Sequence, residues 1–403
     1  MSAAYDGEPA PRRTLAGATI LQIVPALREE PATHAAINVA RTLLRAGARA
    51  LIAADEGPLL TELRSFGAEW IPLANATIDP LKLRRNVRTL EQVVSSERVD
   101  ILHAQSAGAA WSARIAASRV AVWLVTTVPD VPPSVGRLSG LYSAALAQSD
   151  RMIAPSIYAA TPLMRRYGIP PDQITIIPRA IDTATFDPAA AKPHRVAAVL
   201  NSWQIAPNDR VVVVPGRVAP WNGQILLPEI ARMLMDAGAR DVVFILVGET
   251  VTHAKYAAAV LKQAEALGVE KMIRLAGHCA DMPAAFAAAE IVLVPAIEPP
   301  LLGRVVAQAQ AMARPVVTAD IGVLPEHVVV PPRLPEDLRT GWVARAGDTV
   351  EFAQALGLAL SLDPAAYRAM AARARQFAEY MFAPQSVAEA TRMVYSALLS
   401  REI

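Results

Sequence analysis

Short apolar runs rich in Val and Ile recur along the first half of the chain, separated by stretches with apolar residues at helical spacing. Runs of this length are too short for helices and suit strands buried on both faces of a parallel sheet. The predicted strands cover residues 19–25, 50–54, 70–73, 100–104, 122–128, 152–155 and 174–178. The predicted helices cover residues 33–46, 58–65, 81–96, 107–118, 137–148 and 157–167. This alternation predicts a doubly wound α/β domain.

A second series of strands begins at Arg210, after a connecting segment 182–209 that has weaker periodicity and more Pro and Ala. We expect one short helix in that connection. The later strands are predicted at 210–215, 242–247, 272–276, 291–294 and 315–318, and the final helices at 350–362, 364–381 and 386–399. The pattern therefore predicts two consecutive Rossmann-like domains, residues 1–187 and 188–383, with a cleft between them.

The stretch 291–326 has the pattern expected around a ligand site. A buried strand is followed by the loop 298–303, a helix at 304–313, and another strand that begins at Pro315. In open parallel sheets, ligands bind beyond the carboxyl ends of the strands, where such loops and helix N-termini collect. We therefore expect a ligand here.

Composition narrows the class of protein. The chain has 403 residues, 53% of them hydrophobic and 19% charged, with a net charge of +2. A charge this low gives no case for nucleic acid, which usually requires a concentrated basic face. The only cysteine is Cys279, so no intramolecular disulfide can form and a reducing compartment is favoured. No apolar leader and no run near the roughly 18 apolar residues of a membrane span is visible, so we expect a cytoplasmic protein.

One basic segment allows two interpretations. The basic segment Leu81 to Arg88 is typical of a solvated helix face, and the alternative is peripheral contact with the inner face of the cytoplasmic membrane. His278 and Cys279 are adjacent but have no partners at metal-ligand spacing, so no metal site is predicted.

Several short motifs, in order and with matching spacing, resemble those of bacterial family-4 glycosyltransferases of the GT-B fold. They are YGI at 167–169, IIPRAID at 176–182 with Phe186, PGRV at 215–218, WNG at 221–223, GH at 277–278, DMP at 281–283, GRVVAQAQAM at 303–312 and TGWV at 340–343, the last expected as a turn. The resemblance covers nearly the whole chain.

The resemblance implies a nucleotide-sugar donor held mainly by the second domain and a glycan or lipid-linked acceptor on the first. It implies retaining, metal-independent transfer with no cofactor, in cell-envelope or polysaccharide biosynthesis. It also implies that the last helix, within residues 384–403, crosses back to complete the first domain. A paralogous glycosyltransferase is a further candidate partner.

The resemblance also indicates which residues would form the donor site. Arg217 occupies the family's phosphate-binding arginine position, with a salt bridge at a strand end as the alternative. Gly303 and Glu326 match the family's glycine and its later glutamate, although Glu326 could instead be only a helix N-cap. Two further residues are catalytic candidates. Glu298 lies two residues from the family's register and could instead be a solvated loop carboxylate, and His103 could instead be a satisfied histidine at a strand end.

Several donor-site positions depart from the family pattern. Asn222 replaces a lysine, and Pro300 and Gln308 replace the two glutamates of the Glu-x7-Glu pair. In the first domain, Glu30 and Pro31 replace a Gly-Gly loop, and Pro129 replaces a histidine. We therefore weigh three functions: a family-4 glycosyltransferase, a non-catalytic relative that binds or scaffolds a partner, and an enzyme whose rewired donor site uses Glu298, Gln308 and Arg217.

Overall fold

The computed structural model describes residues 14–75, 79–128, 144–332 and 335–400. The chain divides into two compact units, one formed by residues 1–180 with 384–403 and the other by residues 181–383. Pro129 and most of the helix expected at 137–148 lie outside the described residues.

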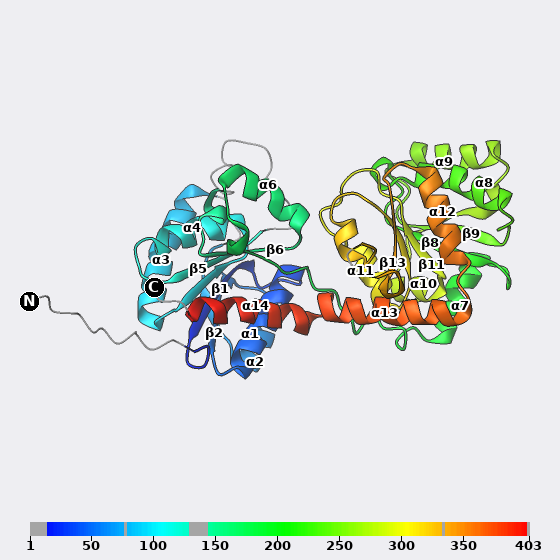
Figure 1. Ribbon diagram of the computed structural model, residues 1–403. Coiled ribbons are helices and arrows are strands. Elements are labelled where there is room, and N and C mark those ends of the chain that lie inside the picture. The colour runs from blue at the N-terminus through cyan, green and yellow to red at the C-terminus, as the bar shows by residue number, and fades with distance from the viewer. Residues whose placement is uncertain (1–13, 76–78, 129–143, 333–334, 401–403) are drawn as a thin grey trace, which may run out of the picture. The chain divides into compact units, whose positions relative to one another are not determined.

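The first unit contains a parallel sheet of seven strands in the order β3-β2-β1-β4-β5-β6-β7 (Figure 1). The strands are β1 Thr19–Ala26, β2 Arg49–Asp55, β3 Glu69–Pro72, β4 Ile101–Ala104, β5 Trp123–Thr127, β6 Arg151–Ala154 and β7 Ile174–Ile176. All seven predicted strands are present, close to their predicted bounds. Their side chains are mostly buried, as expected for a sheet covered on both faces.

Helices cover both faces of this sheet. They are α1 Pro31–Arg45, α2 Leu60–Ser65, α3 Pro80–Glu97, α4 Ala107–Ala117, α6 Ile157–Tyr167 and α14 Pro384–Leu399. Successive residues of β1 point to opposite faces: Ile20 joins the core beneath α1, α2 and α14, whereas Leu21 joins the core beneath α3 and α4. The last helix, α14, packs against α1 within this unit (Figure 1).

Local start signals explain where several of these helices begin. The carboxylate of Asp79 accepts from the N–H of Leu81 at 2.9 Å, directly before Pro80 opens α3. Helix α1 begins at Pro31, earlier than the predicted start at residue 33. Proline suits the first helical position because its fixed φ is helical and its missing N–H would have no intrahelical acceptor.

The second unit contains a parallel sheet of six strands in the order β10-β9-β8-β11-β12-β13. The strands are β8 Arg210–Pro215, β9 Val242–Val247, β10 Ile273–Gly277, β11 Ile291–Val294, β12 Val316–Ala319 and β13 Gly341–Ala344. The five predicted strands are present. The expectation of a turn at 340–343 was wrong, because these residues pair with β12 and form the edge strand β13.

The helices of the second unit are α7 Pro193–Ser202, α8 Leu227–Asp236, α9 Ala254–Ala266, α10 Met282–Ala288, α11 Arg304–Ala311, α12 Thr349–Leu360 and α13 Pro364–Phe382. Helix α8 packs on α9 and α12, α7 on α10, and α11 on α13. In the part of the chain that the structure describes, no helix is both long enough and apolar enough to cross a membrane.

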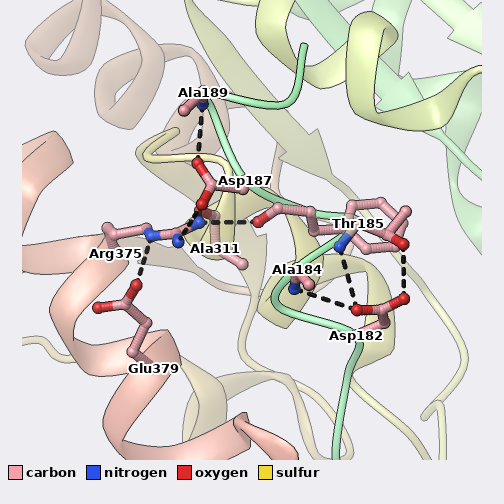
Figure 2. Close-up of polar contacts among 9 residues, drawn as sticks. Asp182, Ala184, Thr185, Asp187, Ala189, Ala311, Arg375 and Glu379 are labelled. Atoms are coloured by element: carbon pink, nitrogen blue, oxygen red, sulfur yellow. Dashed lines mark hydrogen bonds and ion pairs between the residues drawn. The ribbon is translucent and has the colours of Figure 1, made fainter.

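One arginine on α13 hydrogen-bonds both to the first residues of the second unit and to the end of α11 (Figure 2). Arg375 on α13 donates to the carbonyl oxygens of Phe186 at 2.8 Å and Ala311 at 2.6 Å, and to the carboxylate of Asp187 at 3.1 Å. Ala311 is the last residue of α11, and the last carbonyls of a helix have no intrahelical partner and attract a cation. This contact fixes the carboxyl end of the helix whose other end faces the site described next.

Candidate donor-binding site

Three loops follow neighbouring strands of the second sheet and meet at its carboxyl edge. They are residues 216–223 after β8, 295–303 after β11 and 320–327 after β12, and these strands are adjacent in the order β8-β11-β12. Ligands bind at this edge in open parallel sheets. All three loops belong to the second unit.

The first two loops are joined backbone to backbone. The carbonyl of Trp221 accepts from the N–H of Ile297 at 3.0 Å and from that of Glu298 at 3.2 Å. A Cβ atom at Gly223 would lie 1.9 Å from the carbonyl oxygen of Pro295, and Gly223 has a φ of +72°. Only glycine tolerates both the positive φ and the close approach of this carbonyl. Gly223 therefore allows the two loops to pack against each other. The Glu298 side chain is exposed beside it.

Arg217 offers its guanidinium to solvent at this edge. Its side chain is 56% exposed, and its Nε lies 3.6 Å from Oε2 of Glu249, which follows β9. The N–H of Thr252 donates to the same carboxylate at 2.6 Å. This bond, with a smaller contribution from Arg217, lowers the pKa of Glu249. Arg217 therefore has a salt-bridge partner and remains accessible to a bound anion.

Asn222 is turned toward its own loop. Its Nδ2 donates to the carbonyl oxygen of Arg217 at 2.7 Å, and that oxygen also accepts from Nε2 of Gln224 at 3.0 Å. The side chain that replaces the family's lysine thus braces the backbone of residues 217–222. It supplies no charge to this edge of the sheet.

The start of α11 is held by a histidine that follows Glu326. His327 Nδ1 lies 3.1 Å from the carbonyl oxygen of Gly303, which also accepts from the N–H of Ala307 at 3.0 Å. Because the partner is a carbonyl, Nδ1 must carry the hydrogen. Burial lowers the pKa of His327 to about 4. A Cβ at Gly303 would lie 2.1 Å from Nδ1, so the ring fills the space that a side chain would need.

The positions that replace the two family glutamates differ in their contacts. Pro300 uses its carbonyl to accept from the N–H of Val323 at 3.3 Å, which ties the second loop to the third. Gln308 lies on α11 and is partly exposed. Glu326 is not a helix N-cap: it lies inside the 3-10 helix Leu324–His327, whose N-cap is Val323. The capping alternative for Glu326 is therefore wrong.

In the first unit, His103 is held in the core. Nδ1 lies 2.6 Å from the hydroxyl of Tyr395 on α14, and Nε2 lies 2.7 Å from the hydroxyl of Thr127. Burial lowers its pKa to about 3, with a smaller contribution from the charge of Arg179. Both ring nitrogens are engaged and the side chain is buried, so the geometry supports the satisfied strand-end histidine over the catalytic role that we expected.

The loop between β1 and α1 carries its own negative charge. Glu29, Glu30 and Pro31 are exposed where α1 begins, and Glu29 lies 2.8 Å from Nε2 of His34. Glu30 is the N-cap, although its side chain makes no capping hydrogen bond. A helix N-terminus attracts anions. Here the carboxylates of Glu29 and Glu30 precede the helix and Pro31, which has no N–H, is its first residue, so this terminus is poorly suited to bind a phosphate.

Among the described residues, no group of three His, Cys, Asp or Glu side chains is arranged to hold a metal ion. Sequence reasoning missed His327 and Glu249. Glu249 follows a strand adjacent to β8, so the rule that loops at one sheet edge meet could have indicated it. No sequence signal indicated His327, because its partner Gly303 is brought to it by the fold.

Comparison with known proteins identifies both halves of the chain. Residues 32–185 match the family profile of Glycosyltransferase Family 4, and residues 209–361 match that of Glycosyl transferases group 1. A D-inositol 3-phosphate glycosyltransferase of Segniliparus rotundus is 32% identical over 203 residues, which cover 49% of this chain and 43% of the relative. A protein of the same name from Kineococcus radiotolerans is 30% identical, with 66% of this chain and 61% of the relative covered. The chain thus spans about half the length of the first of these curated relatives.

Solved structures agree on the fold. A glycosyltransferase from Rickettsia africae aligns with a TM-score of 0.72 and 23% identity, covering 96% of this chain and 100% of that one. The Anabaena protein HepE in complex with UDP aligns with a TM-score of 0.69 and 20% identity, covering 94% and 100%. These structures show the fold alone. The two profiles, which together match residues 32–185 and 209–361, show that the chain belongs to the bacterial family-4 glycosyltransferases.

Proposed function

We propose that the protein transfers a sugar from a nucleotide-sugar donor to a glycan or lipid-linked acceptor, with retention and without a metal ion. The observation that carries this proposal is the convergence of three loops beside the exposed Arg217 at the carboxyl edge of the second sheet. The HepE structures with UDP and UDP-glucose support a nucleotide sugar as the donor. Such donors are made in the cytoplasm, where we place the protein.

The leaving group of this reaction is a nucleotide diphosphate, whose departure places negative charge on its phosphates. Arg217 and the N–H groups at the start of α11 are two positive features of the second unit that could stabilise that charge. Gln308 and Glu326 are our candidates for hydrogen bonds to the donor, and Glu298 for the catalytic carboxylate. The missing lysine at Asn222 could cost about 2–4 kcal/mol of transition-state stabilisation, as removal of one oxyanion donor does.

A basic groove in the first unit supports an anionic, membrane-associated acceptor. A cavity of about 670 Å³ lies between α3 and α4. Its lining includes Arg84, Arg85, Arg88 and Arg119 around the Trp111 ring. Leu81, also in the lining, is 75% exposed. Clustered arginines next to apolar side chains favour anionic lipid surfaces.

This contact can be tested with vesicles. Arg84→Gln with Arg88→Gln should reduce sedimentation with phosphatidylglycerol vesicles, whereas Arg114→Gln, an exposed residue elsewhere on α4, should not. Equal sedimentation with neutral phosphatidylcholine vesicles would argue against the electrostatic contact.

The alternative function is a non-catalytic relative that serves as a binding or scaffolding partner, for example of a paralogous glycosyltransferase. It is favoured by the side chain of Asn222, which braces its own loop, and by Pro300, whose carbonyl binds Val323. Neither position can offer the charge that the family places there.

A turnover assay separates the two functions. The purified protein is incubated with UDP-glucose, GDP-mannose and ADP-glucose, and release of nucleoside diphosphate is measured. Release that Arg217→Ala reduces by at least tenfold would support the enzyme. If release appears only in the triple variant Asn222→Lys, Pro300→Glu, Gln308→Glu, the non-catalytic relative is supported and the wild-type site is a decayed one.

A further inference from the structure

A second cavity lies in the second unit at the opposite edge of the sheet from the donor loops. It has a volume of about 640 Å³ and opens where β8, β11 and β12 begin, at Arg210, Glu290 and Arg314. Its other walls come from α7, from the end of α10 and from the start of α13. No strand presents its carboxyl end here, so the donor site cannot extend into this cavity.

Some charged side chains that line this cavity form ion pairs, and Arg314 does not. Arg210 lies 3.3 Å from the Glu290 carboxylate, and Asp209 lies 3.7 Å from Arg274 outside the lining. Arg314 makes no ion pair among the described residues: its Nη1 meets the Tyr367 hydroxyl at 3.4 Å, and its buried Nε has no hydrogen-bond partner. The hydroxyl of Tyr367 in turn donates to the backbone carbonyl of Glu290 at 2.8 Å.

A partly buried guanidinium without a carboxylate partner, such as that of Arg314, destabilises the folded protein unless an anion binds to it. Burial raises the pKa of Glu290 and that of Tyr367, and the Arg210 and Glu290 side chains are each 31% exposed, so the polar groups here are partly shielded from water. A guanidinium in such a place is stabilised by a planar carboxylate, which can accept two parallel N–H bonds. Arg368 also lines the cavity, but it is exposed and its charge acts on the Asp363 carboxylate. Arg314 is therefore the one half-buried cation of the lining without a carboxylate partner among the described residues, and a single negative charge would match it.

The remaining walls are apolar. They include Leu200, Ile205, Val211, Ala288 and Leu362. An apolar lining with few polar groups that fix orientation is typical of small-molecule sites. We propose that this cavity binds a small organic monoanion, a carboxylate with a flat or short apolar body, which Arg314 receives.

Benzoate is the probe, with benzamide as its neutral analogue and phenyl phosphate as its dianionic one. Binding to the full-length protein is measured by protein-observed NMR titration. We expect saturable millimolar binding of benzoate and at least tenfold weaker binding of benzamide and phenyl phosphate. Arg314→Gln should weaken benzoate at least tenfold, whereas Arg240→Gln, an exposed arginine with the same charge change, should leave it unchanged.

Because Arg314→Gln also removes the contact with Tyr367, a second variant keeps the test decisive. Ala197→Trp fills the cavity from the exposed side of α7 and leaves all the arginines in place. It should abolish benzoate binding while the thermal unfolding midpoint stays within a few degrees of wild type. Equal binding of benzoate and benzamide, or wild-type benzoate affinity in both variants, would overturn the proposal.

Discussion

The imidazole of His327 lies against the backbone of Gly303, with Nδ1 3.1 Å from its carbonyl oxygen. This contact joins the loop after β11 to the loop after β12 at the start of α11. It also explains the glycine. A Cβ at position 303 would lie 2.1 Å from Nδ1, so the two residues cannot both keep their places if the glycine is replaced.

Gly303→Ala should therefore destabilise the second unit. Overpacking against a buried ring costs about 1–3 kcal/mol, and we expect the upper part of that range because the ring is enclosed. The measurement is the free energy of unfolding in urea. Gly357→Ala is the matched control: this helical glycine has open space around its Cβ position, so alanine there should stabilise by about 0.5–1 kcal/mol. A Gly303→Ala protein as stable as wild type would contradict the packing described here.

The same histidine should make stability depend on pH. Its pKa is lowered to about 4 in the folded protein, from 6.5, so the unfolded chain binds more protons between these values. The contribution is fully present above the unfolded pKa and is lost as the pH falls from 6.5 toward 4. Between pH 7 and pH 5 the loss should be about 2 kcal/mol.

His327→Gln removes this titration and keeps an N–H donor for Gly303. The free energy of unfolding of the variant should fall less than that of wild type between pH 7 and pH 5, by about 2 kcal/mol. An unchanged pH dependence would contradict the buried, neutral histidine.

Arg375 should be a large contributor to the stability of the second unit. Its side chain is 19% exposed and binds two backbone carbonyls and the carboxylates of Asp187 and Glu379 (Figure 2). Arg375→Ala would leave those carbonyls unpaired and should cost about 2–4 kcal/mol. Arg232→Ala, which breaks an exposed helical pair with Asp236, should cost less than about 1 kcal/mol. If both variants lost the same free energy of unfolding, the contacts of Arg375 would not have the stabilising role described here.

Ala313 occupies a conformation that favours glycine. Its φ is +54°, and it ends α11 in a Schellman motif, with the N–H of Arg314 donating to the carbonyl of Ala309 at 3.0 Å. Ala313→Gly should relieve the strain and stabilise by up to about 1 kcal/mol. Ala372→Gly, in the interior of α13, should instead destabilise by about 1 kcal/mol. A loss of stability in both variants would contradict the strained turn.

The sequence predicted the strands and helices well because each strand is a short apolar run and each helix has its own period. It did not predict β13, because residues 341–344 form a strand only through pairing with β12. The placement of Arg217 and Gly303 in loops after β8 and β11 followed from motif spacing. The contacts of His327 with Gly303 and of Asn222 with the Arg217 carbonyl did not, because they depend on how separate loops pack in space.

The most direct test of the proposed function is nucleotide binding. The purified protein is titrated with UDP, GDP and ADP by calorimetry, beside Arg217→Ala and the exposed control Arg240→Ala. We predict saturable binding of one nucleotide at micromolar to millimolar concentration, at least tenfold weaker in Arg217→Ala and unchanged in Arg240→Ala. No binding of any of the three nucleotides at millimolar concentration would contradict a functional donor site.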